Sequence, residues 1–112
     1  MQYALAIYIE PGYEEALSDA ERDTMYAEFF TLGEDPRVIG GARLQPVETA
    51  TSVRVDGGRT LVTDGPFADT KEVLGGFALV EAANLDEVIE FAARVPPARL
   101  GGVVEIRPVM QR

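Results

Sequence analysis

The chain of 112 residues contains no cysteine and no histidine. Without cysteine it can form neither a disulfide bond nor a thiolate nucleophile. Without histidine it cannot use the Ser–His or Cys–His pairs of nucleophilic catalysis, and it lacks the commonest protein ligand of zinc. Any proton transfer must therefore depend on Asp, Glu, Lys or Tyr side chains.

Basic residues are also scarce. Ten Lys and Arg residues stand against 19 Asp and Glu residues, which gives a formal net charge of −9 and a pI of about 4.4. Such a surface repels phosphate backbones, so we expect no direct contact with nucleic acid. No apolar run reaches the roughly 18 residues of a membrane span, and no basic region precedes the apolar N-terminus as in a secretory signal. We expect one cytoplasmic domain over residues 1–112.

Six segments have the alternating or β-branched pattern of strands. Residues 2–9 are apolar on both faces, which predicts a central strand. Gly40-Gly41 predicts a bulge or a close backbone approach in the second segment, and Asp56-Gly57-Gly58 predicts a hairpin turn whose tip projects into solvent. Pro108 places the last segment near a sheet edge. The six segments are residues 2–9, 37–44, 51–55, 59–63, 74–81 and 102–109.

Two segments have helical periodicity, and each begins at a capping residue. Ser18 and Glu21 have the spacing of a capping box, and Asn84 and Glu87 repeat it. Gly33 is the expected C-cap of the first helix, and a proline pair ends the second. The predicted buried stripes are Tyr26, Phe29, Phe30 and Gly33, widened by Met25 and Leu32, in the first helix and Val88, Ile89, Ala92 and Val95 in the second.

Leaving out the hairpin, the order of elements is strand, helix, strand, strand, helix, strand. This order predicts an α+β fold of the ferredoxin-like type, in which both helices cover one face of an antiparallel sheet. The other face would expose apolar residues that include Ala4, Ala6 and Tyr8, a patch too large for a monomer. We therefore expect a homodimer through the open sheet face. The pattern leaves open whether the copies pack face to face or side by side.

The segment between the hairpin and the next strand combines turn-forming residues with charge. Residues 64–77 read D-G-P-F-A-D-T-K-E-V-L-G-G-F. Charged side chains on a loop that is held between two strands are typical of functional sites. Asp64 is the sharpest candidate. It can be interpreted as a base or hydrogen-bond acceptor in a cleft, or as a turn residue that accepts backbone amides two residues on.

Five further residues are candidate ligand contacts. Lys71 would hold an anionic ligand and lower the pKa of a nearby carboxylate, with Glu72 beside it; the alternative is that both are solvated loop charges. Phe67 and Phe77 would form walls of a pocket, or pin the two ends of the loop by core packing. Arg43 would contact an anion or join an ion pair.

No nucleotide or metal motif accompanies this loop. The chain has neither a G-x-G-x-x-G element nor a Walker sequence. The acidic pairs Glu14-Glu15 and Asp86-Glu87 do not resemble a calcium loop, and the second pair suits a helix N-terminus. We expect no metal and no cofactor.

Four segments along the chain resemble one family. They read M-Q-Y-A-L-A-I-Y at residues 1–8, G-G-A-R-L-Q-P at 40–46, L-V-T-D-G-P-F at 61–67 and V-E-I-R-P-V at 104–109, and they are similar to the DGPF, or YCII-related, proteins. The resemblance implies a ferredoxin-like dimeric α/β barrel. It also implies a transcription-related context, because such proteins are often found near sigma-factor genes. Related proteins pair a histidine with an aspartate at their proposed site, and this chain has no histidine for that pair.

Three functions fit these observations. We expect a small-molecule-binding or accessory protein with a cleft between the sheet, the loop at residues 64–77 and a partner subunit. One alternative is a small-molecule enzyme, such as a lyase, isomerase or hydrolase, with Asp64 as the base and Lys71 stabilising developing negative charge. The other is a protein-interaction module that recruits a basic partner. A ligand that raises the melting temperature would separate the first two from the third.

Overall fold

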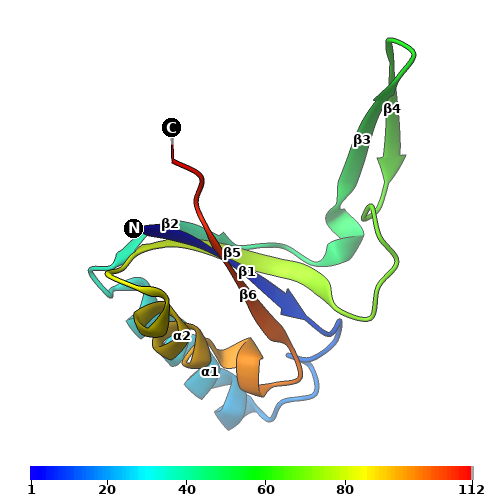
Figure 1. Cartoon of the computed structure of the whole chain (residues 1–112). Coiled ribbons are helices and arrows are strands. Elements are labelled where there is room, and N and C mark those ends of the chain that lie inside the picture. Colours follow the sequence, from blue (N-terminus) through cyan, green and yellow to red (C-terminus); the bar gives the residue numbers. More distant parts are fainter. Residues whose placement is uncertain (112) are drawn as a thin grey trace.

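The computed structural model of the chain describes residues 1–111. A four-stranded sheet has both α-helices on one face, and a separate two-stranded hairpin stands on the opposite side (Figure 1). The elements are β1 (Gln2–Ile9), α1 (Asp19–Gly33), β2 (Val38–Arg43), η1 (Val47–Thr49), β3 (Thr51–Asp56), β4 (Arg59–Asp64), β5 (Val73–Glu81), α2 (Leu85–Ala93), η2 (Pro96–Arg99) and β6 (Val103–Pro108).

The main sheet has the strand order β2-β5-β1-β6, and every neighbouring pair is antiparallel. This is the ferredoxin-like arrangement, so the predicted α+β fold is confirmed. β1 is central, as its two apolar faces predicted, and β6 is an edge strand, as Pro108 predicted. A register shift between Val38 and Gly40 confirms the bulge in β2.

The core lies between the sheet and the two helices. Alternate residues of β1 (Tyr3, Leu5 and Ile7) point toward the helices and are buried. The buried residues that complete this core are Leu32, Val80, Ala82, Val88, Phe91, Ala92 and Val95.

The buried faces of both helices match the prediction in part. In α1, Tyr26 is 41% exposed and Phe30 is 71% exposed, whereas Met25 and Leu32 are buried. The core therefore meets the part of the expected stripe that carries Phe29 and Leu32, and not the part that carries Tyr26 and Phe30. In α2, Ile89 is 50% exposed and Phe91 takes its place in the core. Both helices carry more apolar residues than one face can bury, so packing decides which of them face inward.

The helix termini follow the sequence closely. The Ser18 hydroxyl accepts a 3.1 Å hydrogen bond from the amide of Glu21, and the Glu21 carboxylate accepts one of 2.8 Å in return, so the capping box is confirmed. The Asn84 side chain caps α2 as expected. Gly33 is the last residue of α1 and not its cap; Glu34 is the cap, in an ordinary right-handed conformation.

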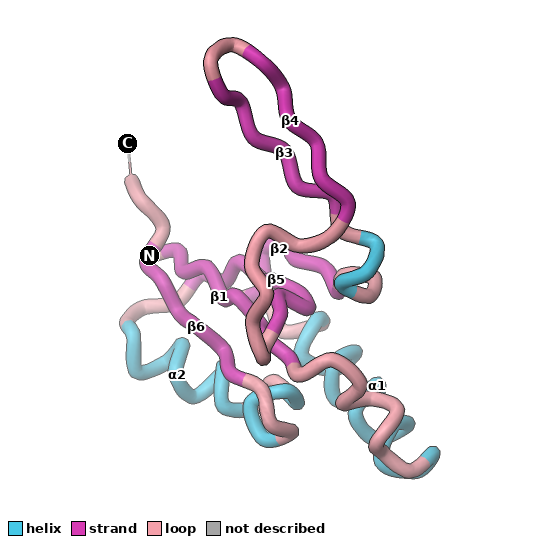
Figure 2. The backbone as a smooth tube through the Cα atoms, turned by 90° about the vertical axis from the view of Figure 1, so that its right-hand side faces the viewer, coloured by secondary structure: helices cyan, strands magenta, loops and turns pink. Residues whose placement is uncertain are grey.

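The hairpin is the outlying part of the molecule. Gly57 and Gly58 adopt φ values of 55° and 78°, the two positive angles that a two-residue type I′ turn requires. Figures 1 and 2 show β3 and β4 extending away from the main sheet on the side opposite the helices. No helix within residues 1–111 is long and apolar enough to cross a membrane.

Candidate functional site

A groove runs along the edge strand β2 beneath α1. Its volume is about 760 Å³, and its floor is formed by Gly40, Gly41 and Ala42, which have little or no side chain. Gly41 has a φ of 149°, and a Cβ there would lie 2.4 Å from the carbonyl oxygen of Phe77. Only glycine fits this close approach. The helix side of the groove is apolar and consists mainly of Tyr26, Phe29, Phe30 and Leu32.

Arg43 forms the polar end of the groove. It lies at the end of β2 opposite Gly76, and its guanidinium carbon is 4.8 Å from the ring centroid of Phe29 and 5.3 Å from that of Tyr26. Both distances are within the range of cation–π attraction. The two rings of α1 therefore hold the cation at the mouth of an apolar groove.

Glu14 fixes this arrangement. One of its carboxylate oxygens accepts a hydrogen bond from Nη2 of Arg43, and the other accepts a 2.8 Å bond from the Tyr26 hydroxyl. Arg43 has five N–H donors, of which one on Nη2 bonds to Glu14, and its side chain is 44% exposed. Several guanidinium donors are thus available to a ligand oxygen.

The tyrosines of this cluster are held in their protonated form. The hydrogen bond to Glu14 raises the pKa of Tyr26 above its ordinary value, and partial burial adds to the effect. Burial, followed by the charge of Glu14, raises the pKa of Tyr13, which lies beside the cluster. The Tyr26 phenol donates its proton to a hydrogen bond with Glu14, and the raised pKa favours this protonated form.

The cluster separates the groove from two smaller hollows. One of about 270 Å³ lies between residues 11–15 and 44–48 and is bordered by Val73 and Leu74. The other, of about 30 Å³, lies beneath Arg43 and Glu14 and reaches Gly75 and Gly76. The pair Gly75-Gly76 of the 64–77 segment therefore borders the same Arg43–Glu14 cluster as the groove.

Of the remaining candidates, Phe77 borders the groove, and the others lie apart from it. Asp64 ends β4 with an exposed side chain, and no hydrogen bond reaches its carboxylate from residues 1–111. The turn that follows is held instead by Gly65, whose amide donates to Ala50 at 2.7 Å and whose carbonyl accepts from Ser52 at 2.8 Å. The structural interpretation of Asp64 as a turn cap is therefore wrong, while its role in a site stays a prediction.

The charged and aromatic loop residues are largely solvent-accessible. Lys71 pairs with Glu10 at 3.2 Å, and its side chain is 77% exposed. Glu72 is half-buried, and its carbonyl accepts the hydroxyl of Thr70. Phe67 is 77% exposed with the Arg54 guanidinium 4.8 Å from its ring centroid, and Phe77 is 45% exposed on β5. Neither phenylalanine packs in the core, so the core-packing interpretation of both is wrong.

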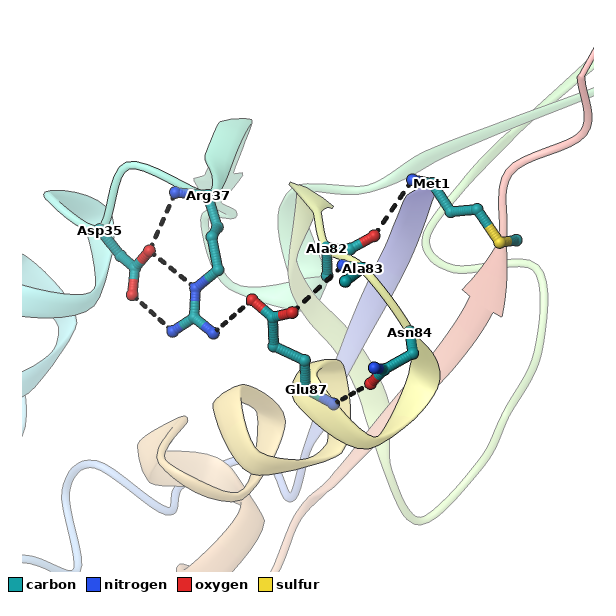
Figure 3. Close-up of polar contacts among 7 residues, drawn as sticks. All are labelled: Met1, Asp35, Arg37, Ala82, Ala83, Asn84 and Glu87. Atoms are coloured by element: carbon teal, nitrogen blue, oxygen red, sulfur yellow. Dashed lines mark hydrogen bonds and ion pairs between the residues drawn. The ribbon is translucent and has the colours of Figure 1, made fainter.

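A second polar cluster has a structural role. The Arg37 guanidinium donates to both carboxylate oxygens of Asp35, at 3.0 and 2.8 Å, and to Glu87 at 3.2 Å (Figure 3). The other Glu87 oxygen accepts the amide of Ala83 at 3.1 Å, while the Glu87 amide donates to Asn84. The cluster thus ties the segment before β2 to the N-terminus of α2. The hydrogen bonds from Arg37 lower the pKa of Asp35 to about 2.

Little in the sequence pointed to the groove cluster, which consists of Glu14, Tyr26, Phe29 and Arg43. Tyr26 and Phe30 were assigned to a buried stripe, although their spacing of four residues also suits an exposed aromatic wall. Glu14 belongs to a connector, and it meets Tyr26 and Arg43 only in the folded chain. In the part of the chain that the structure describes, no three carboxylates gather into a group that could hold a metal ion.

The sequence of residues 1–112 matches the YCII-related domain. The chain belongs to the YCII-related family. This YCII-related chain is 35% identical over 114 residues to an uncharacterised protein of Rhizobium meliloti (strain 1021), an alignment that covers 97% of this chain and 92% of that protein.

Among solved structures, this YCII-related fold is similar to 5-chloro-2-hydroxyhydroquinone dehydrochlorinase (TftG) from Burkholderia phenoliruptrix AC1100 in complex with 2,5-dihydroxybenzoquinone. The TM-score is 0.59 and the sequence identity is 18%, over 100% of this chain and 96% of that one. At this identity the likeness concerns the fold.

Proposed function

We propose that the protein binds a planar, oxygen-bearing aromatic small molecule in the groove between α1 and β2. The observation that carries the proposal is an apolar, aromatic-walled groove of about 760 Å³ that ends at the Arg43 guanidinium. Binding sites of small molecules are mostly apolar with a few convergent polar groups, and their usual size is roughly 300–1,000 Å³. The ring of the ligand would lie against Tyr26 and Phe30, and its oxygen would accept from Arg43.

The fold neighbour supports this choice of ligand. TftG is a dehydrochlorinase of a hydroxyhydroquinone and was solved with a dihydroxybenzoquinone, so the same fold accommodates an oxygenated six-membered ring. The chain offers such a ring two kinds of contact. Phe30 presents an exposed aromatic ring, and Glu14 already holds the cation of Arg43 by a hydrogen bond.

A second candidate is an enzyme with Asp64 as the base. The specific observation in its favour is that the Asp64 carboxylate is exposed and accepts no hydrogen bond from residues 1–111, which leaves it available to a substrate. Its site would lie at the loop formed by residues 64–77, beside a partner subunit. Lys71 would then stabilise negative charge on the substrate.

Binding of 2,5-dihydroxybenzoquinone, measured by calorimetry and thermal shift, tests both locations. We expect the probe to bind the wild type and Asp64→Asn, and to lose at least about fivefold in affinity to Phe30→Ala, because a stacked aromatic contact is worth roughly 1 kcal/mol or more. Leu85→Ala, which truncates a 48% exposed side chain on α2, is the matched control. Binding abolished by Asp64→Asn but not by Phe30→Ala would move the site to the loop.

We also propose that two copies associate through the open face of the main sheet. The register places Phe77 beside Ala6 and Val103 beside Tyr8 on this face. Phe77, Leu74 and Val103 are 45%, 44% and 51% exposed. Helices cover only the other face (Figure 1), so the apolar side chains of this one have no cover within residues 1–111.

A further inference from the structure

The β3–β4 hairpin receives little cover from the rest of the described chain, apart from the loop contact between Arg54 and Phe67. Its two six-residue strands pair only with each other and form a sheet separate from the main one. Both views show this arm standing away from the body, on the side of the open sheet face (Figures 1 and 2). A lone two-stranded ribbon is marginally stable in water at best. The arm, residues 51–64, therefore gains stability from any surface that covers it.

The two faces of the arm differ in chemistry. The register pairs Val53 with Val62 and places Val55 on the same side, and these three residues are defined here as the valine face. They are 61%, 63% and 69% exposed. The opposite face is mostly polar, and there Arg54 stacks on Phe67 of the same chain. The valine face is thus the apolar side, and the chain's own loop contacts the other side.

We propose that the valine face packs on a second copy of this chain, so that each arm clasps the partner's body beside the open sheet face. This inference rests on the homodimer proposed above and extends its interface. The arm rises on the same side of the molecule as the open face, so a second copy seated on that face meets the arm as well.

The open sheet face alone is smaller than a stable dimer interface, which supports a dimer in which the arms also take part. With strands about 4.8 Å apart and a rise of about 3.3 Å per residue, four strands of about six residues cover roughly 400 Å². A stable interface buries about 800 Å² on each partner. By the same measure the arm of one copy buries roughly 200 Å² of its own surface. The partner's arm buries a similar area on the body of that copy. The sheet face and the two arms together reach the size that a stable dimer needs.

Charge and symmetry also favour a second copy of this chain as the partner of the arm. The arm has two basic and two acidic residues (Arg54, Arg59, Asp56 and Asp64), so it is neutral and the formal charge of −9 resides in the rest of the chain. Two acidic bodies repel each other, whereas a neutral arm approaches an acidic body without that cost. A two-fold axis would let each copy give one arm and receive one, which closes the assembly at two.

The test compares two glutamates placed on adjacent residues of β4. Val62→Glu puts a charge on the valine face, and Thr63→Glu puts the same charge on the polar face. We expect sedimentation velocity to show a dimer dissociation constant at least about tenfold higher for Val62→Glu, because an unpaired charge is costly to bury, and less than about threefold higher for Thr63→Glu.

Thiol labelling gives an independent readout in the same hairpin. Because the chain has no cysteine, Val55→Cys and Asp56→Cys each carry one thiol, on opposite faces of β3. Maleimide labelling of Val55→Cys should slow when the protein is concentrated above its dissociation constant, while labelling of Asp56→Cys should not. The arm would have no role in the dimer if Val62→Glu had the same dimer dissociation constant as the wild type and if the labelling rate of Val55→Cys did not depend on protein concentration. In that case dissociation by Ala6→Glu would still uphold the sheet-face dimer, and a wild type that stays monomeric would overturn both.

Discussion

The Tyr26 hydroxyl donates a 2.8 Å hydrogen bond to Glu14, which lies twelve residues earlier in the chain. The other oxygen of the same carboxylate accepts from Arg43. Glu14 therefore joins the connector before α1, the exposed side of α1 and the end of β2. This link holds the Arg43 cation over the aromatic rings, where the proposed ligand would meet it.

Replacing Glu14 should change the titration of Tyr26. The bond to Glu14 raises the Tyr26 pKa above 10.0, so the folded chain holds this proton more tightly than the unfolded chain. That stabilisation is complete below pH 10.0 and is lost as the pH rises through the folded pKa. In Glu14→Gln the Tyr26 pKa should return toward 10.0. Phenolate absorbance, with Tyr26→Phe to assign the signal and Glu15→Gln as control, measures the change; an unaltered Tyr26 titration would contradict the assignment.

The floor of the groove depends on one glycine of the adjacent pair. Gly41→Ala should destabilise the fold by about 1–3 kcal/mol, because its Cβ would lie 2.4 Å from the carbonyl oxygen of Phe77 and its φ is 149°. Gly40→Ala is the matched control, since no atom lies within 4 Å of the added Cβ. Urea unfolding should give Gly40→Ala a stability within about 1 kcal/mol of the wild type. Equal effects of the two substitutions would rule out the steric explanation.

The Asp35–Arg37 pair should make stability depend on acid pH. Arg37 lowers the Asp35 pKa from 3.8 to about 2, so the carboxylate contributes stability that is present above pH 3.8 and is lost as the pH falls through about 2. The melting temperatures of the wild type and Asp35→Asn should therefore differ most above that window and converge below it. A constant difference across the acid range would contradict the pairing.

A charge on the open sheet face should dissociate the proposed dimer. Ala6 lies between Phe77 and Glu105 on this face. Both Ala6→Glu, which adds a like charge beside Glu105, and Ala6→Lys should yield monomers in sedimentation velocity, because either charge would lose its water in the interface. Ala27→Glu, at an exposed position of α1, is the control for the added charge. A dimer that survives both substitutions at Ala6, with circular dichroism unchanged, would refute the face-packing proposal.

Asp64→Asn should leave stability nearly unchanged. No hydrogen bond from residues 1–111 reaches the Asp64 carboxylate, so the substitution removes no native contact, and we expect a change within about 0.5 kcal/mol. Chemical unfolding measures this. A loss of roughly 1–2 kcal/mol would instead restore the turn-cap interpretation. Loss of ligand binding at constant stability would favour the Asp64-based alternative.

The local sequence was enough to predict the elements and their ends. The capping residues Ser18 and Asn84 and the glycines at 57 and 58 act over three or four residues, so their effect is visible without tertiary structure. The order of the elements likewise predicted the ferredoxin-like sheet. The helix faces were less predictable: Phe30 and Ile89 read as core but are exposed, because a helix with excess apolar residues has several faces that could pack inward.

The sequence by itself determined the α+β fold, the hairpin and the chemistry that the chain lacks, since these depend on composition and short-range pattern. Only the tertiary structure brought Glu14, Tyr26 and Arg43 together and placed the exposed side of α1 over the edge of β2. These residues come from three separate segments, and no local pattern encodes which of them meet. Their meeting depends on how the helices and strands pack as rigid units, which the sum of many side-chain contacts decides.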